Sequence, residues 1–200
     1  MSPRPRKVSD DEVFVATQRA MMRLTPAQLT LAEIAREAGL TAGALVQRFG
    51  SKRALLLALM ERFAGETPAM FEAMRRSAPS PLEALRAYGD GMSRMAATPA
   101  MLAHHLSYLQ VDFTDEDFHR YARAQAVAAQ VSLREIAQDA IDAGELRADS
   151  DPALVARLVQ VIVGGSMLAW GFFREGKARA WVREDLDAVL GPYLEVTGDR

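Results

Sequence analysis

The sequence contains no cysteine, and this absence excludes several kinds of chemistry. None of its 200 residues can form a disulfide, act as a thiolate nucleophile or offer a thiolate to a metal. It also lacks an HExxH zinc motif, a glycine-rich phosphate loop and a GxSxG nucleophile motif. His104 and His105 are adjacent and point ~100° apart on a helix, so they do not chelate a metal as an i, i+4 pair does. We expect no catalytic site, no metal site and no cofactor, and a helical enzyme or metal protein is the least supported class.

Long apolar runs are scarce as well. The most apolar run, residues 158–173, contains Gln160, lies between Arg157 and Arg174, and is shorter than the ~20 residues that a membrane-spanning helix needs. The first twelve residues, MSPRPRKVSDDE, have no apolar stretch of the kind found in a signal peptide. We therefore expect no membrane partner and a cytoplasmic location.

The charge is distributed unevenly between the two parts of the chain. Residues 1–53 contain nine basic and five acidic residues, a net charge of +4, whereas the whole chain is −2 and residues 54–200 are therefore −6. A basic segment on an acidic body indicates that the first segment meets a polyanion. Chance clustering explains an excess of four charges about equally well.

Apolar residues recur with a helical period along nearly the whole chain, and no Val/Ile/Tyr-rich alternating segment predicts a sheet. Ser9 with Glu12, and Thr30 with Glu33, predict capping boxes at the starts of the first two helices. Proline predicts several further helix starts, that at Pro68 among them. The fold class is therefore all-α, with later helices expected at about 68–76, 81–97, 99–110, 115–143, 152–174 and 178–195.

Two short amphipathic runs between residues 30 and 50 are joined by AGLT. Gly39 ends the first run and Thr41 caps the second, which Gly50 closes. Neither run would persist as a helix alone in water, so both must pack on a neighbouring helix. This is the helix-turn-helix arrangement of DNA-binding proteins. The alternative is an ordinary helical hairpin with a solvated face.

The second of these helices leaves a distinctive set of side chains facing outward. Small residues at its start let the backbone approach a surface, Gln47 can pair with adenine, and Arg48 can reach guanine or phosphate. Lys52 and the N–H groups after Ser51 form a candidate phosphate site. The candidate DNA-binding residues on this ground are Ala42, Gly43, Val46, Gln47, Arg48 and Lys52, with Arg4, Arg6 and Lys7 placed along the backbone or in a minor groove.

The run TLAEIAREAGLTAGALVQRFGSKRALLLAL resembles the DNA-binding domain of the TetR family of bacterial repressors, over about residues 10–60. The family typically has a threonine-led IA..AG.S.G.LY.HF.SK..L run. This chain departs from it at Val46, where the family has a tyrosine that contacts phosphate, and at Arg48 and Gly50, where it has histidine and proline. The resemblance assigns DNA contacts to Thr30, Thr41, Gly43, Gln47 and Lys52.

The resemblance also implies a domain organisation. It implies about nine helices and a homodimer, with a three-helix helix-turn-helix domain at residues 1–52 and a helical ligand-sensing and dimerisation domain at residues 53–200. The helix that starts near Lys52 would connect the two domains rigidly.

Residues 152–173 are apolar almost all round, and such a helix is buried on every side. We expect one side to meet a second copy, with a further stripe in residues 183–194 completing a four-helix interface. A monomer with a fully buried central helix is the alternative. The candidate dimer residues are Leu154, Leu158, Ile162, Gly165, Leu186, Val189 and Leu190.

Residues 66–175 are rich in methionine, whose flexible side chain suits an irregular cavity, and in aromatic residues with a polar group. They predict a pocket for a hydrophobic, uncharged or weakly polar molecule, while plain core packing explains any single methionine better. The candidate pocket residues are Met70, Met74, Met92, Met95, His105, Tyr108, Phe118, Tyr121, Met167 and Trp170.

The function expected from these features is ligand-responsive transcriptional regulation. The protein would be a repressor that binds a palindromic double-stranded operator and is released by a small hydrophobic effector, which tilts the fourth helix and changes the spacing of the two recognition helices. The alternative is a helical ligand- or protein-binding module whose helix-turn-helix has lost specific DNA binding.

Overall fold

The computed structural model describes residues 8–195, and within that range the chain forms nine α-helices and no strand. The predicted all-α fold is thus confirmed. The helices are α1 (Asp10–Met21), α2 (Leu31–Ala38), α3 (Ala42–Phe49), α4 (Lys52–Ser77), α5 (Pro81–Ser93), α6 (Pro99–Thr114), α7 (Glu116–Asp142), α8 (Pro152–Phe173) and α9 (Ala178–Leu190). One turn of 3-10 helix follows α5 and another follows α9.

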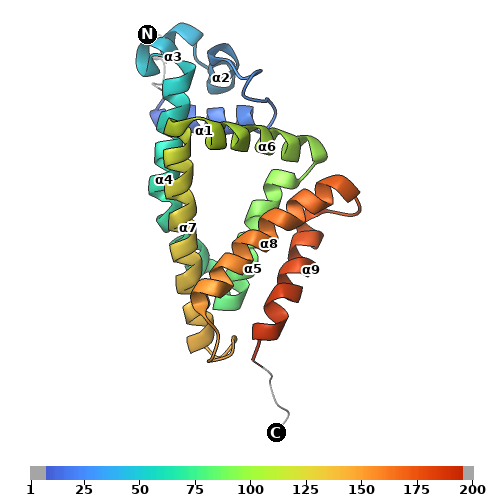
Figure 1. The fold of residues 1–200 in the computed structure, drawn as a ribbon. Helices are drawn as coiled ribbons and strands as arrows, with labels where there is room; N and C mark the ends of the chain where they lie inside the picture. The colour runs from blue at the N-terminus through green and yellow to red at the C-terminus, as the bar shows by residue number, and fades with distance from the viewer. Residues whose placement is uncertain (1–7, 196–200) are drawn as a thin grey trace, which may run out of the picture.

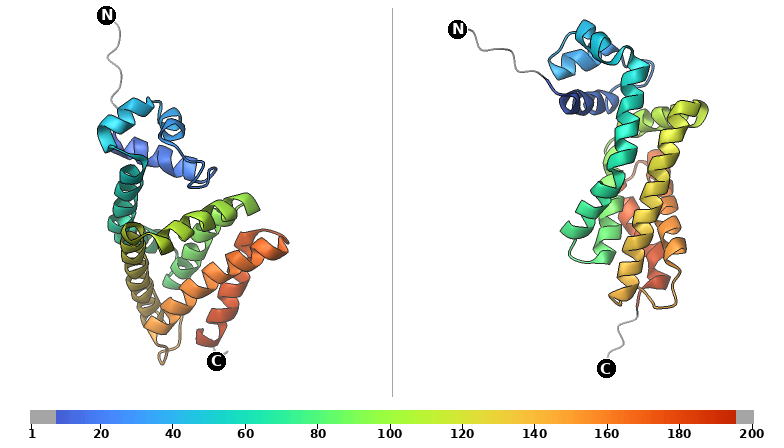
Figure 2. Two further views of the ribbon diagram at one scale, coloured as in Figure 1. Left: turned by 45° about the horizontal axis from the view of Figure 1, so that its top comes forward. Right: turned by 90° about the vertical axis from the view of Figure 1, so that its left-hand side faces the viewer.

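The first three helices sit together at one end of a long column formed by α4 and α7, which run side by side (Figures 1 and 2). Helix α6 crosses next to the N-terminal helices, and α5, α8 and α9 pack together farther along the column (Figure 1). The N-terminal helices are therefore placed on the rest of the chain by α4 and by the side of α6 that faces them.

Short polar residues start the N-terminal helices where the sequence predicts. Ser9 and Glu12 form a complete capping box at α1. At α2 only half of the predicted capping box forms: the Thr30 hydroxyl accepts a hydrogen bond from the Glu33 N–H, whereas the Glu33 carboxylate pairs with Arg36. The Thr41 and Ser51 hydroxyls cap α3 and α4 in the same way. Gly39 ends α2 with φ of 66°, a left-handed conformation that glycine adopts without steric cost.

The predicted helix break before Pro68 is wrong. Helix α4 continues through this proline to Ser77, although proline has no N–H to donate to the carbonyl four residues earlier. Both halves of α4 are held by long-range packing, because Leu59 on one side of Pro68 and Phe71 on the other are almost fully buried. Beyond Phe71, the Arg75 Nε lies 2.5 Å from the Asp139 Oδ2 on α7. Tertiary packing thus outweighs the local preference of one residue.

Two hydrophobic clusters hold the fold together. The core cluster joins α4 to α9 and includes the fully buried Leu85, Leu133 and Val159. The N-terminal cluster joins α1 to α4 and includes Val13, Leu29, Ile34, Leu45 and Leu55, with Phe118 of α7 as its contribution from the other part of the chain.

Helix α8 has two contrasting faces. Its length of 22 residues exceeds the expected apolar run, and by length and composition alone it could cross a membrane. One face, including Val159 and Met167, is buried in the core cluster, as in the central helix of a folded domain. The other face is uncovered within the chain, because Val161 is 67% exposed and Phe172 is 79% exposed.

Two glycines of α5 provide a test of the packing between helices. A Cβ added at Gly89 would lie 3.0 Å from the Val182 Cγ1 of α9, whereas one added at Gly91 would meet nothing within 4 Å. Gly89→Ala should lower the free energy of unfolding by about 1–3 kcal/mol through overpacking. Gly91→Ala should raise it by up to about 1 kcal/mol, because alanine has the higher helix propensity. Urea unfolding of both variants measures the difference, and equal effects would contradict the close approach of α5 to α9.

Candidate nucleic-acid interface

Helices α2 and α3 are eight residues each and depend on the N-terminal cluster for their stability. Ile34 of α2 and Leu45 of α3 are fully buried, and they fix the angle between the two helices. On the opposite side of α3, Gly43, Val46 and Gln47 are exposed, with Val46 at 49%. The structure therefore presents α3 as a short helix with an uncovered and nearly uncharged face, as the sequence predicts for these residues.

The threonines and Ala42 have mainly local roles within the chain. The Thr30 hydroxyl caps α2 and the Thr41 hydroxyl caps α3, and each accepts from a backbone N–H while its own O–H stays available. Ala42, at the start of α3, is half-buried.

Arg48 does not point outward from α3 as the sequence analysis expected. Its Nε pairs with the Asp10 carboxylate at the start of α1, and its Nη1 donates to the Val8 carbonyl at 2.8 Å. The guanidinium also lies 5.6 Å from the centre of the Phe49 ring. The expected contact with guanine or phosphate therefore requires Arg48 to leave these partners.

Lys52 is likewise engaged inside the chain. Its ammonium donates to the Pro26 carbonyl at 2.9 Å and to the Leu29 carbonyl at 2.8 Å. These carbonyls belong to the α1–α2 connection, residues 22–30. Two of the three ammonium donors are therefore used before any phosphate arrives.

The basic excess of the N-terminal segment lies mostly outside the described residues. Arg4, Arg6 and Lys7 fall in residues 1–7, which the structure does not describe, whereas residues 8–53 contain six basic and five acidic residues. Most of the arginines in residues 8–53 form ion pairs, such as that of Arg23 with Glu37 at 2.5 Å. The interface formed by the described residues is thus close to electrically neutral.

Two side chains of α6 bind the α1–α2 connection. The Tyr108 hydroxyl donates to the Leu24 carbonyl at 2.9 Å, and the His104 Nδ1 lies 3.1 Å from the Met22 carbonyl oxygen. Burial raises the pKa of Tyr108 to about 12, so this tyrosine stays protonated and remains a donor at neutral pH.

A second link joins the start of α4 to the α6–α7 corner, residues 112–119. Arg53 pairs with Asp115 at 2.5 Å and with Asp117 at 2.7 Å, and its guanidinium lies 5.2 Å from the centre of the Phe118 ring. The sequence analysis missed this link, because it joins residues more than 60 positions apart and no local pattern marks it.

The residues predicted to line a ligand pocket are divided between the two hydrophobic clusters and the surface. Met70 and Met95 are 59% and 40% exposed, whereas Met167 and Trp170 are buried in the core cluster, with Met74 and Met92 packed against it. Tyr108 and Phe118 pack with the N-terminal cluster. Only His105 and Tyr121 are half-buried and outside both clusters. The helical period identifies buried faces but does not identify which neighbour covers them.

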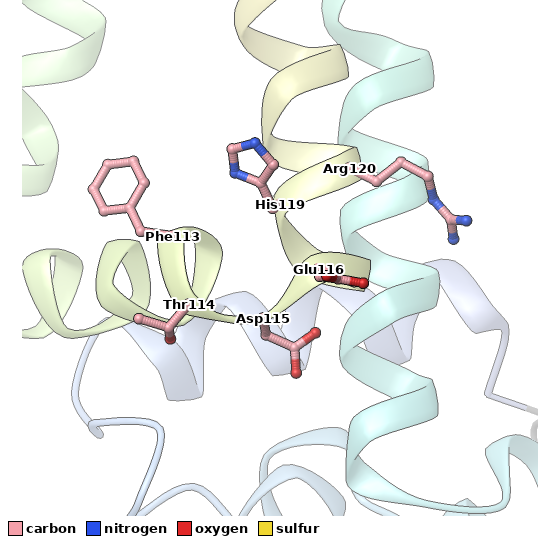
Figure 3. Close-up of a pocket in the computed structure, with 6 residues that line it drawn as sticks. All are labelled: Phe113, Thr114, Asp115, Glu116, His119 and Arg120. Atoms are coloured by element: carbon pink, nitrogen blue, oxygen red, sulfur yellow. The ribbon is translucent and has the colours of Figure 1, made fainter.

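A shallow hollow of about 240 Å³ lies instead at the α6–α7 corner. Its lining residues are Phe113, Thr114, Asp115, Glu116, His119 and Arg120. In Figure 3, the rings of Phe113 and His119 project on the same side of the corner, while Asp115 points to the opposite side and Arg120 points away from it. Phe113 is 74% exposed, so a large aromatic surface is open to a bound molecule. A second hollow, of about 380 Å³, lies at the start of α9 and is lined by Lys177, Arg179, Ala180 and Arg183.

The hollow has a polar neighbour in Asp112. The His119 Nδ1 lies 3.2 Å from the Asp112 backbone oxygen, and burial raises the pKa of the Asp112 carboxyl, although the charge of His119 opposes the shift. Among the described residues, no three His, Asp or Glu side chains group to hold a metal ion.

The expected dimer surface also needs correction. Leu186 and Leu190 are fully buried in the chain's own core cluster and are not available to a second copy. Leu154, Leu158, Ile162 and Val189 are half-buried. The exposed face of α8 is formed by Val161, Gly164, Gly165, Leu168 and Phe172, which we call the α8 stripe. A Cβ added at either glycine would meet nothing within 4 Å, so the backbone of α8 is accessible along this stripe.

Comparison with known protein families gives one match, in the segment that contains α2 and α3. Residues 25–59 match the bacterial regulatory proteins of the tetR family. No curated protein sequence matches the chain.

Several solved structures share the fold of nearly the whole chain. A TetR transcription regulator from Haloarcula marismortui is 20% identical with a TM-score of 0.73, and the match covers 92% of this chain and 97% of that one. The regulator FadR from Bacillus subtilis, in complex with stearoyl-CoA, is 16% identical with a TM-score of 0.68, and the match covers 96% and 100%. SmeT, the repressor of a multidrug efflux pump of Stenotrophomonas maltophilia, is 21% identical with a TM-score of 0.65, and the match covers 96% and 93%.

Two carboxylates of the α6–α7 corner should respond to pH in opposite ways. Arg53 holds the pKa of Asp115 below its usual range, so Asp115 stabilises the folded state above about pH 4 and loses this effect as the pH falls through its folded pKa. Burial raises the pKa of Asp112, so its charge opposes folding at neutral pH, and this penalty disappears on acidification.

Unfolding by urea at about pH 6 and pH 3.5 tests this difference on Asp115→Asn and Asp112→Asn. Asparagine still caps α7 at position 115, so the first variant isolates the charge. On acidification, the excess in the free energy of unfolding of wild type over Asp115→Asn should shrink. The free energy of unfolding of wild type should instead rise relative to that of Asp112→Asn. The same trend for both variants would contradict the assignment.

Proposed function

Because residues 25–59 match the tetR family of bacterial regulatory proteins, we propose that this chain is a DNA-binding transcriptional repressor that a small molecule releases from its operator. The observation that carries the proposal is the pair of eight-residue helices α2 and α3. Their packing leaves one face of α3 uncovered in the segment that matches the family. The protein would act in the cytoplasm on double-stranded DNA and would not be an enzyme.

In the proposed complex, α3 lies in the major groove. Gly43 and the half-buried Ala42 let the start of the helix approach the base edges, Val46 offers an apolar contact to a thymine methyl, and Gln47 offers a bidentate pair to adenine. Arg48 would exchange its carboxylate partner Asp10 for a phosphate or a guanine. The hydroxyls of Thr30 and Thr41 are placed at the ends of α2 and α3, from which a phosphate contact is within reach.

The N-terminal arm would supply much of the non-specific attraction. Arg4, Arg6 and Lys7 precede Val8, which Arg48 ties to the C-terminal end of α3. Three cations joined to this point could follow the phosphate backbone or enter the adjacent minor groove.

The functional unit would be a homodimer formed across the α8 stripe. An apolar face with two glycines at its centre suits the close approach of a second α8. A two-fold axis would then place the two α3 helices about 34–36 Å apart, on successive major grooves of a palindromic site.

The proposed effector is a hydrophobic molecule that binds near the α6–α7 corner. Phe113 offers an aromatic face and His119 a polar group on the same side. The complex of FadR with stearoyl-CoA, whose acyl chain is apolar, supports a ligand with a hydrophobic part for this fold. A movement of the corner would be passed to the DNA-binding helices through the contacts of Tyr108 and Arg53. If the effector's binding free energy differs by ~2.7 kcal/mol between the two conformations of the protein, DNA affinity would change about a hundredfold.

A second function is favoured by the partners that Arg48 and Lys52 have within the chain. With Arg48 on Asp10, Lys52 on two carbonyls and valine at position 46, α3 offers few groups that bind DNA directly. The chain would then be a ligand- or protein-binding module whose helix-turn-helix has lost specific DNA binding.

Selection of duplexes from a random DNA library at near-physiological salt separates the two functions. The repressor should enrich a palindrome with half-sites about one helical turn apart, and its affinity should fall with rising salt at a slope of about −0.9 per phosphate contact. The control is the variant Gln47→Ala, which should lose preference at one base pair of each half-site. Folded wild-type protein that enriches no sequence would support the binding module.

Sedimentation equilibrium tests the proposed dimer. Wild type should give twice the mass of one chain at micromolar concentration, and Val161→Glu should give a monomer, because a charge would be buried within the α8 stripe. Met70→Glu on α4 is the matched control, since Met70 is similarly exposed but lies away from the stripe, and it should stay dimeric. A wild-type monomer would rule out this assembly.

A further inference from the structure

Helix α4 begins with two cations, Lys52 and Arg53, and has no acidic residue in its first turn. The N-terminus of a helix carries a partial positive charge, so cations there oppose helix formation unless their side chains find partners elsewhere. Both side chains have such partners outside α4, and the partners of Lys52 and of Arg53 belong to different parts of the chain.

Lys52 reaches back to the α1–α2 connection. Its ammonium donates to the Pro26 and Leu29 carbonyls at 2.9 and 2.8 Å and is partly buried. Leu29 is itself fully buried in the N-terminal cluster, and Thr30, the next residue, caps α2. Lys52 thus holds the start of α2 against the start of α4.

Arg53 reaches forward to the α6–α7 corner. It donates to both oxygens of Asp115 and to one of Asp117, and Asp115 is the residue that caps α7. The first turn of α4 therefore contacts the helix-turn-helix through Lys52 and the α6–α7 corner through Arg53.

We infer that Lys52 is a positioning residue, and that with Arg53 it forms a junction that sets the orientation of α2 and α3 on α4. This inference rests on the proposed DNA binding and adds a positioning role to the phosphate contact that the family resemblance gives to Lys52. Two ammonium donors hold the Pro26 and Leu29 carbonyls and the third is left for a phosphate, so one side chain can fill both roles.

Lys52→Met tests the inference, because methionine keeps an apolar side chain of similar length but cannot donate. DNA affinity should fall at least about tenfold at near-physiological salt, because the orientation of α2 and α3 is lost. In the protein without DNA, hydrogen exchange should accelerate at the amides of residues 22–30. Lys177→Met at the start of α9 is the control and should change neither measurement.

The coupling to Arg53 is tested by a double-mutant cycle. Arg53→Gln should also weaken DNA binding at an unchanged salt slope, and its effect should be less than additive with that of Lys52→Met, because both fix the same turn. Arg75→Gln removes an ion pair to α7 in the last turn of α4 and is the matched control, which should be additive with Lys52→Met and leave DNA affinity nearly unchanged.

Unchanged exchange in residues 22–30 of Lys52→Met would overturn the inference, and a salt slope that falls by about 0.9 would then leave the phosphate contact as the role of Lys52. If wild-type protein binds no duplex, the proposed function fails. The exchange measurement then decides the positioning role alone, because it requires no DNA.

Discussion

Eight residues do not form a helix that is stable alone in water, and the structure depends on how it meets this constraint. Helices α2 and α3 exist because Ile34 and Leu45 are buried between their neighbours and because capping residues satisfy their first N–H groups. The supporting contacts extend beyond the first 60 residues, since Phe118 of α7 completes the N-terminal cluster. The part of the molecule that would read DNA is therefore not independent of the part that would sense an effector.

Ion pairs also connect the N-terminal helices to each other and to the rest of the chain. Within the described residues, most of the arginines near the helix-turn-helix pair with carboxylates, and several of these pairs join segments far apart in the sequence. Exposed pairs of this kind add little stability individually. Their common effect is geometric, because they define how α1 and α4 are oriented relative to the α6–α7 corner.

Sequence reasoning succeeded where the determinants are local. The caps at Ser9, Thr30 and Thr41 and the left-handed Gly39 follow from residue types a few positions apart, and the structure confirms them. It failed at Pro68, where packing on both sides of the proline overrides a local preference. It also misassigned Leu186, because a helical stripe reveals that a face is buried but not that the covering surface belongs to the same chain. The partners of Arg48, Lys52 and Arg53 were beyond reach for a similar reason, since each pairing depends on tertiary structure.

The pairing of Arg48 with Asp10 has a consequence for the search along a genome. A regulator faces a vast excess of non-specific sites, and every free cation on its reading surface lengthens the time spent on each of them. An arginine that is held by its own carboxylate until a well-fitting surface displaces that carboxylate adds little to these brief encounters. The acidic first turn of α1 would in this way lower the affinity for non-specific DNA and shorten the time that the protein spends on each non-specific site.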